Sequence, residues 1–327
     1  MSSRHSSYRL MVASALTPVH PGAGRSPGIV DLPVVRDSLG YPYIPGSEVK
    51  GALKTALARA LGALKGGDGY IDCGKARDLC CLLGPEVEDQ DKHMSAVVIS
   101  HLFLVAIPAP SPESPRGVVY LTSPSRLAIL SNFLNSVGSN DKAAIIREAA
   151  SLVERRALAS FNPGAEYVRI HLTRVPVAGN DNGKARQAGE ALSEVFKSVK
   201  GLHEVASLAD SLLIVPESMA PTLFEKSLLR HTRVRLNRDT KTVWKGGLWT
   251  EEYIPYGSLF AGLIGDSTFR GAPCGKTEER DDDDAVARLS EIAKSHLSGK
   301  DGNTFYLMVG GKETIGSGLL NVNIITG

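Results

Sequence analysis

A segment rich in glycine and proline near the N-terminus, residues 20–45, carries His20 and Asp31. Gly22 and Gly24 stand between these two residues, and glycine permits a ligand to approach the backbone closely. An aspartate can bind a hydrated divalent cation or accept a proton, and a histidine can act as a general acid or base at neutral pH. Aspartate is also a common turn former, and a lone histidine is as often structural. The segment is therefore a candidate catalytic loop with a structural alternative.

The sequence IPGSEVKGALKTAL at residues 44–57 predicts the clearest helix of the chain, because apolar residues recur along it at helical spacing. We expect Ser47 to cap this helix and Gly62 to end it. Lys50 and Lys54 fall with Ser47 on the face opposite the apolar stripe. A helix N-terminus followed by two lysines one turn apart can hold a phosphate group. A solvated helix face has the same spacing, so that alternative remains open.

Basic and aromatic side chains are interleaved in residues 230–256. Within this region His231, Arg233 and Arg235 share one face of a predicted strand whose other face is apolar. A basic sheet face beside aromatic rings suits single-stranded nucleic acid, which binds through phosphate contacts and base stacking. An exposed hairpin with a basic face is an equally good interpretation. The set consists of Arg230, Arg233, Arg235, Arg238, Lys241 and Lys245 with Trp244, Trp249, Tyr253 and Tyr256.

A glycine-rich stretch near the C-terminus, GGKETIGSG at residues 310–318, lies between two predicted strands. The backbone amides of such a loop can cradle a phosphate chain. The glycines can equally serve a hairpin that needs a positive φ at several positions. The stretch is thus a second candidate for phosphate binding, with a purely structural alternative.

The signatures of several enzyme classes are missing. The Gly-Lys pair of the C-terminal glycine loop lacks the upstream glycine of a P-loop, and no G-x-G-x-x-G opens a helix. Four cysteines are too few and too unevenly spaced for a disulfide framework, so we expect them to be reduced. No C-x-x-C spacing supports a zinc site among the residues that could be imagined to form one, namely Cys73, Cys80, Cys81 and His93.

Length and composition limit the class of protein. The chain has 327 residues, about two average domains, of which 43% are hydrophobic and 22% are charged. These proportions are typical of a soluble globular protein and exclude disorder or coiled coil as an overall description. The formal net charge of +2 neither requires nor excludes nucleic acid. No apolar run reaches the roughly 18 residues of a membrane span, and we expect a cytoplasmic protein.

The expected elements alternate along the chain without a regular βαβ repeat. Residues 8–16 and 97–107 predict buried strands, whereas 140–158 and 185–209 predict helices. From residue 231 onward, strand patterns dominate. This mixture predicts an α+β fold.

Taken together and in order, five segments resemble one family, the RAMP superfamily. They are LTPVHPGAGRSPGIVDLPVVRD, YPYIPGSEVKGALKTAL, RGVVYLTSP, TRVRLNRDTKTVWKGGLWTEEYIPYGSLF and VGGKETIGSGLLNV. The segments GIVD and GGLWTEEYIP narrow the resemblance to the repeated backbone subunit of type III-B CRISPR effector complexes, the Cmr complexes. The resemblance is weakest between about residues 135 and 225.

The resemblance implies a ferredoxin-like (RRM-like) palm with an inserted β-hairpin thumb and helical insertions. We expect residues 1–155 and 225–327 to form the palm and residues 156–224 to form the thumb with an associated helical segment. The thumb hairpin itself is placed within residues 156–191, where a period-two strand at 167–173 precedes a polar turn at 178–184. Copies of such a subunit stack head to tail into a filament along a guide RNA, beside other Cmr subunits.

The family also implies an activity, which is cleavage of complementary target RNA at regular intervals within the assembled complex. From the chemistry of an aspartate, which is a weak base at neutral pH, we expect this cleavage to depend on a divalent metal. Asp31 matches the aspartate that serves in cleavage and is the expected site of a weakly bound Mg²⁺ or Mn²⁺. His20, Glu251 and Tyr253 match positions lining the same site. The expected RNA contacts are Arg36, Gly46, Ser47, Lys50, Lys54, Arg233, Arg235, Gly310, Gly311, Lys312, Gly316 and Gly318. Two alternatives stay open: a non-catalytic scaffold that coats guide RNA, and a metal-independent nuclease that depends on His20.

Three positions depart from the family pattern. Glu48 stands where the family usually has serine, Lys54 where it often has arginine, and Ser317 where it has lysine. A carboxylate at position 48 would repel a phosphate unless it points away. The resemblance therefore predicts an RNA contact at position 48 less strongly than at the matching positions.

Overall fold

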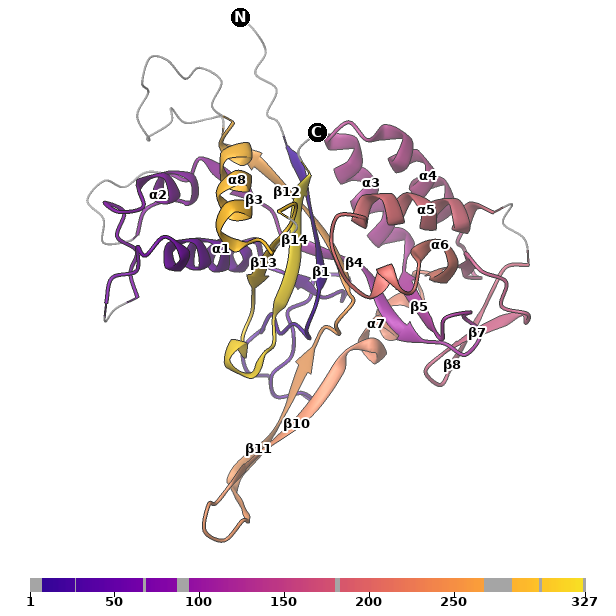
Figure 1. Ribbon diagram of the computed structural model, residues 1–327. Coiled ribbons are helices and arrows are strands. Elements are labelled where there is room, and N and C mark those ends of the chain that lie inside the picture. Colours follow the sequence, from indigo (N-terminus) through magenta and orange to yellow (C-terminus); the bar gives the residue numbers. More distant parts are fainter. Residues whose placement is uncertain are drawn as a thin grey trace, which may run out of the picture.

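The strand β1 (Arg9–Ala15) is apolar on both faces and therefore has to be covered on both sides. Met11 and Ala13 point into one hydrophobic cluster, and Leu10 and Val12 point into another. Successive side chains of a strand point to opposite faces, so these two clusters lie on opposite sides of the sheet. The fold is accordingly a central sheet with a core on each face (Figure 1).

The computed structural model describes residues 8–26, 28–66, 69–86, 94–179, 183–267, 284–299 and 302–325. Within them the largest sheet has ten strands, in the order β13-β14-β1-β12-β4-β5-β9-β6, with β2 paired to β4 and β3 paired to β12. These strands are β2 (Tyr43–Ile44), β3 (Val97–Ile99), β4 (Leu102–Pro110), β5 (Val118–Thr122), β6 (Leu158–Ala159), β9 (Leu212–Ile214), β12 (Leu259–Asp266), β13 (Phe305–Met308) and β14 (Leu319–Ile325), together with β1.

The centre of this sheet has the strand order of a ferredoxin-like fold. The strands β14, β1, β12 and β4 are neighbours in that order, and each neighbouring pair is antiparallel. The helix α1 (Gly46–Ala60) lies in the connection from β1 to β4, and α8 (Ala285–Leu297) lies in the connection from β12 to β14. Two such crossovers interleaved in one sheet form the split β-α-β arrangement, which agrees with the expected palm.

Helices cover both faces of the sheet. One face packs against α1, α8 and α2 (Arg77–Leu83), and the other packs against α3 (Pro124–Ser136), α4 (Asn140–Ser151) and α5 (Lys184–Phe196) (Figure 1). Two shorter helices, α6 (Leu208–Ser211) and α7 (Ala220–Ser227), follow α5. No helix in the described part of the chain is long and apolar enough to cross a membrane.

Some element boundaries differ from those expected. The helix expected over 140–158 ends at Ser151, and the one expected over 185–209 ends at Phe196. Gly201 lies after this second end with φ 165, an extended conformation that interrupts a helix. At α1 the expected end near Gly62 is confirmed, with φ 64 at that glycine. The expected cap is wrong, because Pro45 occupies the N-cap position and no side chain caps the helix.

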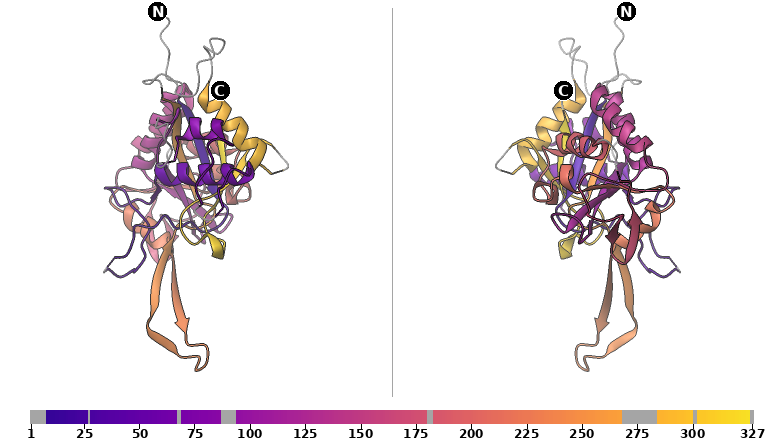
Figure 2. Two further views of the ribbon diagram at one scale, coloured as in Figure 1. Left: turned by 90° about the vertical axis from the view of Figure 1, so that its left-hand side faces the viewer. Right: turned by 90° about the vertical axis from the view of Figure 1, so that its right-hand side faces the viewer.

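A long hairpin projects from the body of the protein (Figures 1 and 2). It consists of β10 (Leu229–Leu236) and β11 (Val243–Tyr253), paired antiparallel from Leu229–Tyr253 outward. Its outer half carries large apolar side chains that are 46–62% exposed, namely Val234, Leu236, Val243, Trp244 and Leu248. An exposed apolar group of this size on a projecting element is typical of an interaction surface.

The projecting hairpin is therefore not where the sequence placed it. Residues 167–176 do form a hairpin, β7 (Tyr167–Ile170) and β8 (Thr173–Pro176), but Val168, Ile170 and Val175 are completely buried in the main core. The apolar face of this hairpin packs against the body. The projecting hairpin is therefore formed by residues 229–253 and not, as expected, by residues within 156–191. Residues 180–182 of the expected polar turn lie outside the described residues. The division of the chain into 1–155 with 225–327 and 156–224 stays a prediction.

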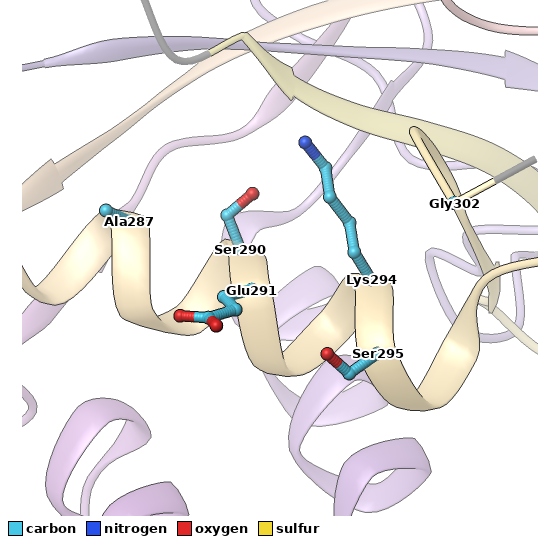
Figure 3. A pocket seen from close by; sticks show the side chains of 6 residues that line it. All are labelled: Ala287, Ser290, Glu291, Lys294, Ser295 and Gly302. Carbon is cyan, nitrogen blue, oxygen red and sulfur yellow. The ribbon is translucent and has the colours of Figure 1, made fainter.

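A pocket of about 540 Å³ lies on α8, away from the residues singled out in the sequence (Figure 3). It is lined by Ala287, Ser290, Glu291, Lys294, Ser295 and Gly302. Ser290 and Lys294 extend from one side of the helix, and Glu291 and Ser295 extend from another. The buried Ser290 hydroxyl has no hydrogen-bond partner among the described residues.

Candidate active site and nucleic-acid interface

The glycine- and proline-rich segment after β1 is hydrogen-bonded through its backbone to the base of the projecting hairpin. The amide of Val19 donates to the carbonyl of Ile254 at 2.9 Å, and the amide of Ile254 donates back at 2.8 Å. Further along, Leu32 donates to Thr250 O and accepts from the amide of Glu252, both at 3.1 Å. In this pairing the two extended backbones satisfy each other's polar groups. The candidate catalytic loop is thus held by main-chain hydrogen bonds to β11 and to Ile254, the residue that follows it.

Asp31 lies exposed at the point where this loop meets the hairpin. Its Oδ2 accepts a hydrogen bond from the amide of Thr250 at 2.8 Å, and its carbonyl accepts one from the amide of Ser26 at 3.0 Å. A carboxylate has about four lone-pair sites, so most of its acceptor capacity remains for solvent, a cation or a ligand. The structure thus gives the expected catalytic carboxylate a fixed and accessible position.

His20 is nearly buried, with 5% of its surface exposed. Its Nδ1 lies 2.6 Å from the carbonyl oxygen of Glu252, and because a carbonyl can only accept, Nδ1 carries the proton. In the neutral ring Nε2 is then the acceptor. A Cβ at Gly22 would lie 3.1 Å from Nε2, so the glycine leaves space at the nitrogen that can take a proton.

The carboxylate of Glu251 is fully engaged with other side chains. Its Oε1 accepts from Lys312 Nζ at 2.6 Å and Trp249 Nε1 at 2.8 Å. Its Oε2 accepts from Arg233 Nε at 3.1 Å and the Tyr253 hydroxyl at 2.5 Å. Burial raises the pKa of this carboxyl, but the hydrogen bonds from Lys312, Tyr253, Trp249 and Arg233 outweigh it and lower the pKa to about 2. Glu251 is therefore ionised, binds the four surrounding side chains and is a poor proton acceptor.

Tyr253 is completely buried beside the same carboxylate. Burial and the hydrogen bond to Glu251 raise the pKa of its hydroxyl, so the phenol stays protonated at neutral pH. Its ring lies between two imidazoles, with ring centroids 5.3 Å from His20 and 5.0 Å from His231. The structure therefore places Tyr253 beside both His20 and Glu251, three residues that the resemblance assigns to one site.

The neighbouring Glu252 forms a second charged cluster that the sequence analysis missed. It is buried and pairs with Arg36 at 2.7 Å and Arg230 at 3.5 Å, and it also accepts from the amide of Val34 at 3.3 Å. Glu251 likewise pairs with two cations, Lys312 and Arg233. Each carboxylate is therefore paired with two cations. Arg230 also pairs with Glu225 at 2.8 Å, so the charges around Glu252 balance.

The glycine loop packs against the chain around His20. The amide of Gly311 donates to His20 O at 2.9 Å, and that of Gly318 donates to Pro18 O at 2.8 Å. At Gly310, where φ is +84°, a Cβ would lie 2.6 Å from His20 O; at Gly318, where φ is +97°, a Cβ would clash with Val309 O. These two glycines are required by close packing of the chain on itself. Gly316, in contrast, has φ +82° with open space around it.

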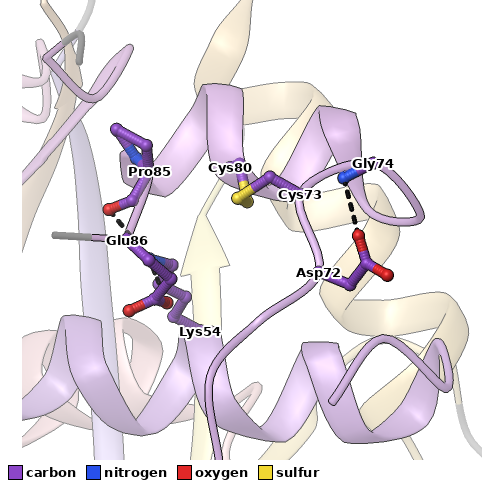
Figure 4. Close-up of a disulfide and its surroundings, with 7 residues drawn as sticks. All are labelled: Lys54, Asp72, Cys73, Gly74, Cys80, Pro85 and Glu86. Atoms are coloured by element: carbon purple, nitrogen blue, oxygen red, sulfur yellow. Dashed lines mark hydrogen bonds and ion pairs between the residues drawn. A yellow bond between two sulfur atoms is a disulfide. The ribbon is translucent and has the colours of Figure 1, made fainter. Parts of the chain in front are cut away.

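The α1 lysines are partly buried and paired. Lys50 Nζ donates to Ser95 Oγ at 2.8 Å, and burial followed by the charge of Lys54 lowers its pKa. Lys54 pairs with Glu86 at 2.8 Å and also donates to the carbonyl of Pro85 at 3.3 Å (Figure 4). They are therefore not a freely solvated face, and RNA that contacts Lys54 would compete with Glu86.

The start of α1 is closely packed. A Cβ at Gly46 would lie 2.6 Å from the carbonyl of Ile99, so this glycine serves helix–strand contact, whereas Ser47 is exposed. Burial raises the pKa of Glu48, and a Cβ at Gly310 would lie 3.4 Å from its Oε1. The carboxylate thus lies toward the glycine loop, between two expected RNA-binding elements.

The cysteines are not all reduced. Cys73 and Cys80 form a disulfide that joins the loop before α2 to that helix, with their Cα atoms 5.6 Å apart (Figure 4). The reduced state expected from the spacing is therefore wrong, because one helical turn brings Cys80 back over the preceding loop. Cys274 and His93 lie outside the described residues. Among the residues that are described, no group of three His, Cys, Asp or Glu side chains could hold a metal ion.

Arg235, an expected RNA contact, stacks its guanidinium over the Trp244 ring, 5.3 Å from the centroid. Arg233 lies closer to the body and is paired with Glu251. Arg36, the remaining arginine of the prediction, is paired with Glu252. Of these three arginines, Arg235 is the one on the outer hairpin.

Comparison with known proteins agrees with this arrangement. The family described as the RAMP superfamily matches residues 12–321. The chain belongs to the RAMP superfamily. This RAMP protein is 26% identical over 320 residues to the CRISPR system Cmr endoribonuclease Cmr4 of Pyrococcus furiosus, with 94% of this chain and 92% of the relative covered. It is 27% identical over 334 residues to the CRISPR system CMR subunit Cmr4 of Saccharolobus solfataricus, with 94% and 93% covered.

Solved structures share the fold of this RAMP protein. A chain in a cryo-EM structure of the type III-B Cmr-beta complex bound to cognate target RNA aligns with a TM-score of 0.70 at 22% identity, covering 98% of both chains. Oligomeric Cmr4 from Pyrococcus furiosus aligns with a TM-score of 0.63 at 20% identity, covering 98% of this chain and 99% of the other. The predicted family and fold class are confirmed.

Proposed function

We propose that this RAMP protein is the repeated backbone subunit of a type III-B CRISPR effector complex, which binds guide RNA and cleaves complementary target RNA. The observation that carries the proposal is the position of Asp31, an accessible carboxylate fixed to Thr250 where the projecting hairpin leaves the body. The support from relatives is that Cmr4 proteins match this chain over more than nine-tenths of both lengths. Partners of the chain are then guide RNA, target RNA, other Cmr subunits and further copies of itself.

Binding of RNA by such a subunit needs no base readout, because pairing between guide and target supplies the sequence specificity. Phosphate contacts set the position of the RNA. Arg235, whose guanidinium lies over the Trp244 ring on the outer hairpin, supplies positive charge there. The exposed apolar side chains of the hairpin suit contact with unstacked bases or with the next copy of the chain.

Cleavage is proposed to proceed by attack of a ribose 2′-oxygen on the adjacent phosphorus. A 2′,3′-cyclic phosphate forms, the bond from phosphorus to the 5′-oxygen of the next nucleotide breaks, and this oxygen takes a proton from water and leaves as a hydroxyl group. The hairpin would hold the target so that this attack is in line, which is a positioning effect. His20 Nε2 is an acceptor for the proton of the attacking hydroxyl, provided that the RNA enters the space beside Gly22. Glu251 and Tyr253 support this site from within the body and keep their protons and charges unchanged.

A divalent cation is part of the proposal. Asp31 would supply one carboxylate, and Mg²⁺ commonly takes one or two carboxylates while its other ligands come from phosphate and water. When bound, Mg²⁺ or Mn²⁺ neutralises negative charge that develops on the phosphate. The absence of a three-residue metal cluster among the described residues is compatible with such weak binding.

The proposal is tested by reconstituting the complex with guide RNA and end-labelled complementary target. We expect target fragments with constant spacing, and loss of these fragments on addition of a chelator with recovery on addition of Mg²⁺ or Mn²⁺. Cleavage that survives the chelator and requires His20 would support the metal-independent nuclease. Tight binding of an intact target would support the scaffold alternative. One observation favours that alternative: the Tyr253 hydroxyl already donates to the Glu251 carboxylate, so neither group is free to act on RNA.

A further inference from the structure

The side chain of Lys312 leaves the glycine loop and reaches a buried carboxylate. Its Nζ lies 2.6 Å from Glu251 Oε1, and the Glu251 side chain is only 2% exposed. The same oxygen accepts the indole N–H of Trp249 at 2.8 Å. An ammonium group bound this closely to a buried carboxylate is not a free phosphate contact, which is the role that the sequence assigned to Lys312.

The backbone of Lys312 is held in an uncommon conformation. Its φ is +71°, in the left-handed region that is costly for a residue with a Cβ. Such conformations persist where surrounding contacts fix them, and they gather at functional sites. Here the neighbouring Gly311 is bonded to His20 O, and Gly318 at the end of the loop is bonded to Pro18 O. The loop is thus anchored, and Lys312 is directed at Glu251 from a fixed position.

Glu251 in turn is connected to the catalytic loop. It lies between Thr250, whose amide binds the Asp31 carboxylate, and Glu252, whose carbonyl binds His20. A shift of Glu251 would therefore move two backbone groups that hold the two candidate catalytic side chains. It would also release the hydroxyl of Tyr253.

From these contacts we propose that Lys312 is a positioning residue for RNA cleavage, acting through Glu251, and that it couples the glycine loop to the site formed by Asp31 and His20. This inference rests on the proposed function. It predicts that removing the ammonium group impairs the chemical step while binding of guide and target remains. It replaces the expectation that Lys312 binds RNA phosphate.

The test compares Lys312→Met and Lys312→Arg in the assembled complex, with Lys197→Met as a matched control. Lys197 also pairs with a glutamate, but it lies directly after the end of α5 with its side chain 70% exposed. We expect the single-turnover cleavage rate of Lys312→Met to fall on the order of 10²-fold, as for other displaced active-site groups, with unchanged guide affinity and salt dependence. Lys312→Arg should recover most of the rate, because a guanidinium keeps the charge and the donors.

A spectroscopic measurement on the whole chain without RNA tests the contact between Lys312 and Glu251 independently of RNA cleavage. The chain has two tryptophans, so Trp244→Phe leaves Trp249 as the sole tryptophan reporter at Glu251. In that background we expect Lys312→Met to change the Trp249 emission spectrum and Lys197→Met to leave it unchanged.

The outcomes separate the two proposals. An unchanged Trp249 spectrum, or full cleavage by Lys312→Met in a complex whose wild type cleaves, would overturn the positioning role alone. Weaker guide binding with a salt slope reduced by about 1 would make Lys312 a phosphate contact instead. A wild-type complex that leaves its target intact would refute the proposed function itself, and the positioning role in cleavage with it.

Discussion

The carboxylate of Asp31 accepts a hydrogen bond from the backbone amide of Thr250, 2.8 Å away, so the loop that carries it is fastened to the strand that becomes the projecting hairpin. Movement of the hairpin base would therefore move the carboxylate. In the proposed complex, RNA that displaces the hairpin would also displace Asp31. This bond thus links the element that we propose to position RNA with the carboxylate that we propose to act on it.

Arg36 is expected to act on stability through Glu252. Arg36→Ala removes the nearest cation, 2.7 Å away, from a carboxylate that is 1% exposed, and we expect the free energy of unfolding to fall by about 2 kcal/mol. Urea denaturation measures this change. Arg186→Ala breaks an exposed pair with Asp210 and should cost less than about 1 kcal/mol. An equally small effect at Arg36, with weakened guide binding, would return that residue to the role of an RNA contact.

Two glycines of the C-terminal loop should respond differently to alanine. Both Gly316 and Gly318 have positive φ, so each substitution carries a backbone cost of roughly 1–2 kcal/mol. At Gly318 the new Cβ also clashes with Val309 O, which should add about 1–3 kcal/mol, whereas the space at Gly316 is open. Thermal unfolding of the two variants checks the difference. Equal melting temperatures would contradict the close packing described for Gly318.

Glu251 should make stability depend on pH in the acid range. Its pKa is lowered in the folded chain to about 2 from an ordinary value of 4.5, so its ionised form stabilises the fold above about pH 4.5. That contribution, up to about 3 kcal/mol, is lost as the pH falls from 4.5 toward 2. The stability difference between wild type and Glu251→Gln should therefore shrink over this range. A difference that stays constant from pH 6 to pH 3 would show that the charge of Glu251 contributes nothing.

Substitutions of Lys54 and Glu86 should change guide affinity in opposite directions. If Lys54 binds phosphate, Lys54→Ala should weaken guide binding for all sequences and reduce the salt slope by about 1. Glu86→Gln should strengthen binding, because it removes the negative charge 2.8 Å from the ammonium group. Glu190→Gln on α5 is a control for the loss of one surface charge. If Glu86→Gln binds guide as the wild type does, the pair is structural.

The sequence predicted the composition of the site better than its internal contacts. The resemblance grouped His20, Glu251 and Tyr253, and the structure places them in contact. The ion pairs Lys312–Glu251 and Arg36–Glu252 join residues 61 and 216 positions apart, and no local pattern indicates which cation meets which carboxylate. Only the strand order and the packing of the glycine loop on residues 18–20 determine these pairs. Even so, the adjacent glutamates of EEY point to opposite faces of a strand and could have suggested two separate clusters.

Elements with a clear apolar periodicity were predicted well. The sequence was a poor guide to which of two alternating hairpins is buried and which is exposed. The buried faces of β1 and α1 follow from their patterns. The projecting hairpin was misplaced because residues 167–173 and 231–236 both alternate apolar and polar side chains. Val168 is completely buried, whereas Val234 is 47% exposed, and nothing in their alternation distinguishes them. Neighbouring elements, here the main core for β7, decide which alternating strand is covered.

The most direct test of the proposed function is target cleavage by a complex assembled with Asp31→Asn, beside the matched surface variant Asp210→Asn. Asparagine keeps the shape of the side chain and an oxygen that can accept from Thr250, but it removes the negative charge. We expect assembly and target affinity to match the wild type while the single-turnover cleavage rate falls by at least about 10²-fold, because the lost interaction acts in the transition state. Asp210→Asn should cleave normally. Cleavage by Asp31→Asn at the wild-type rate would contradict the account.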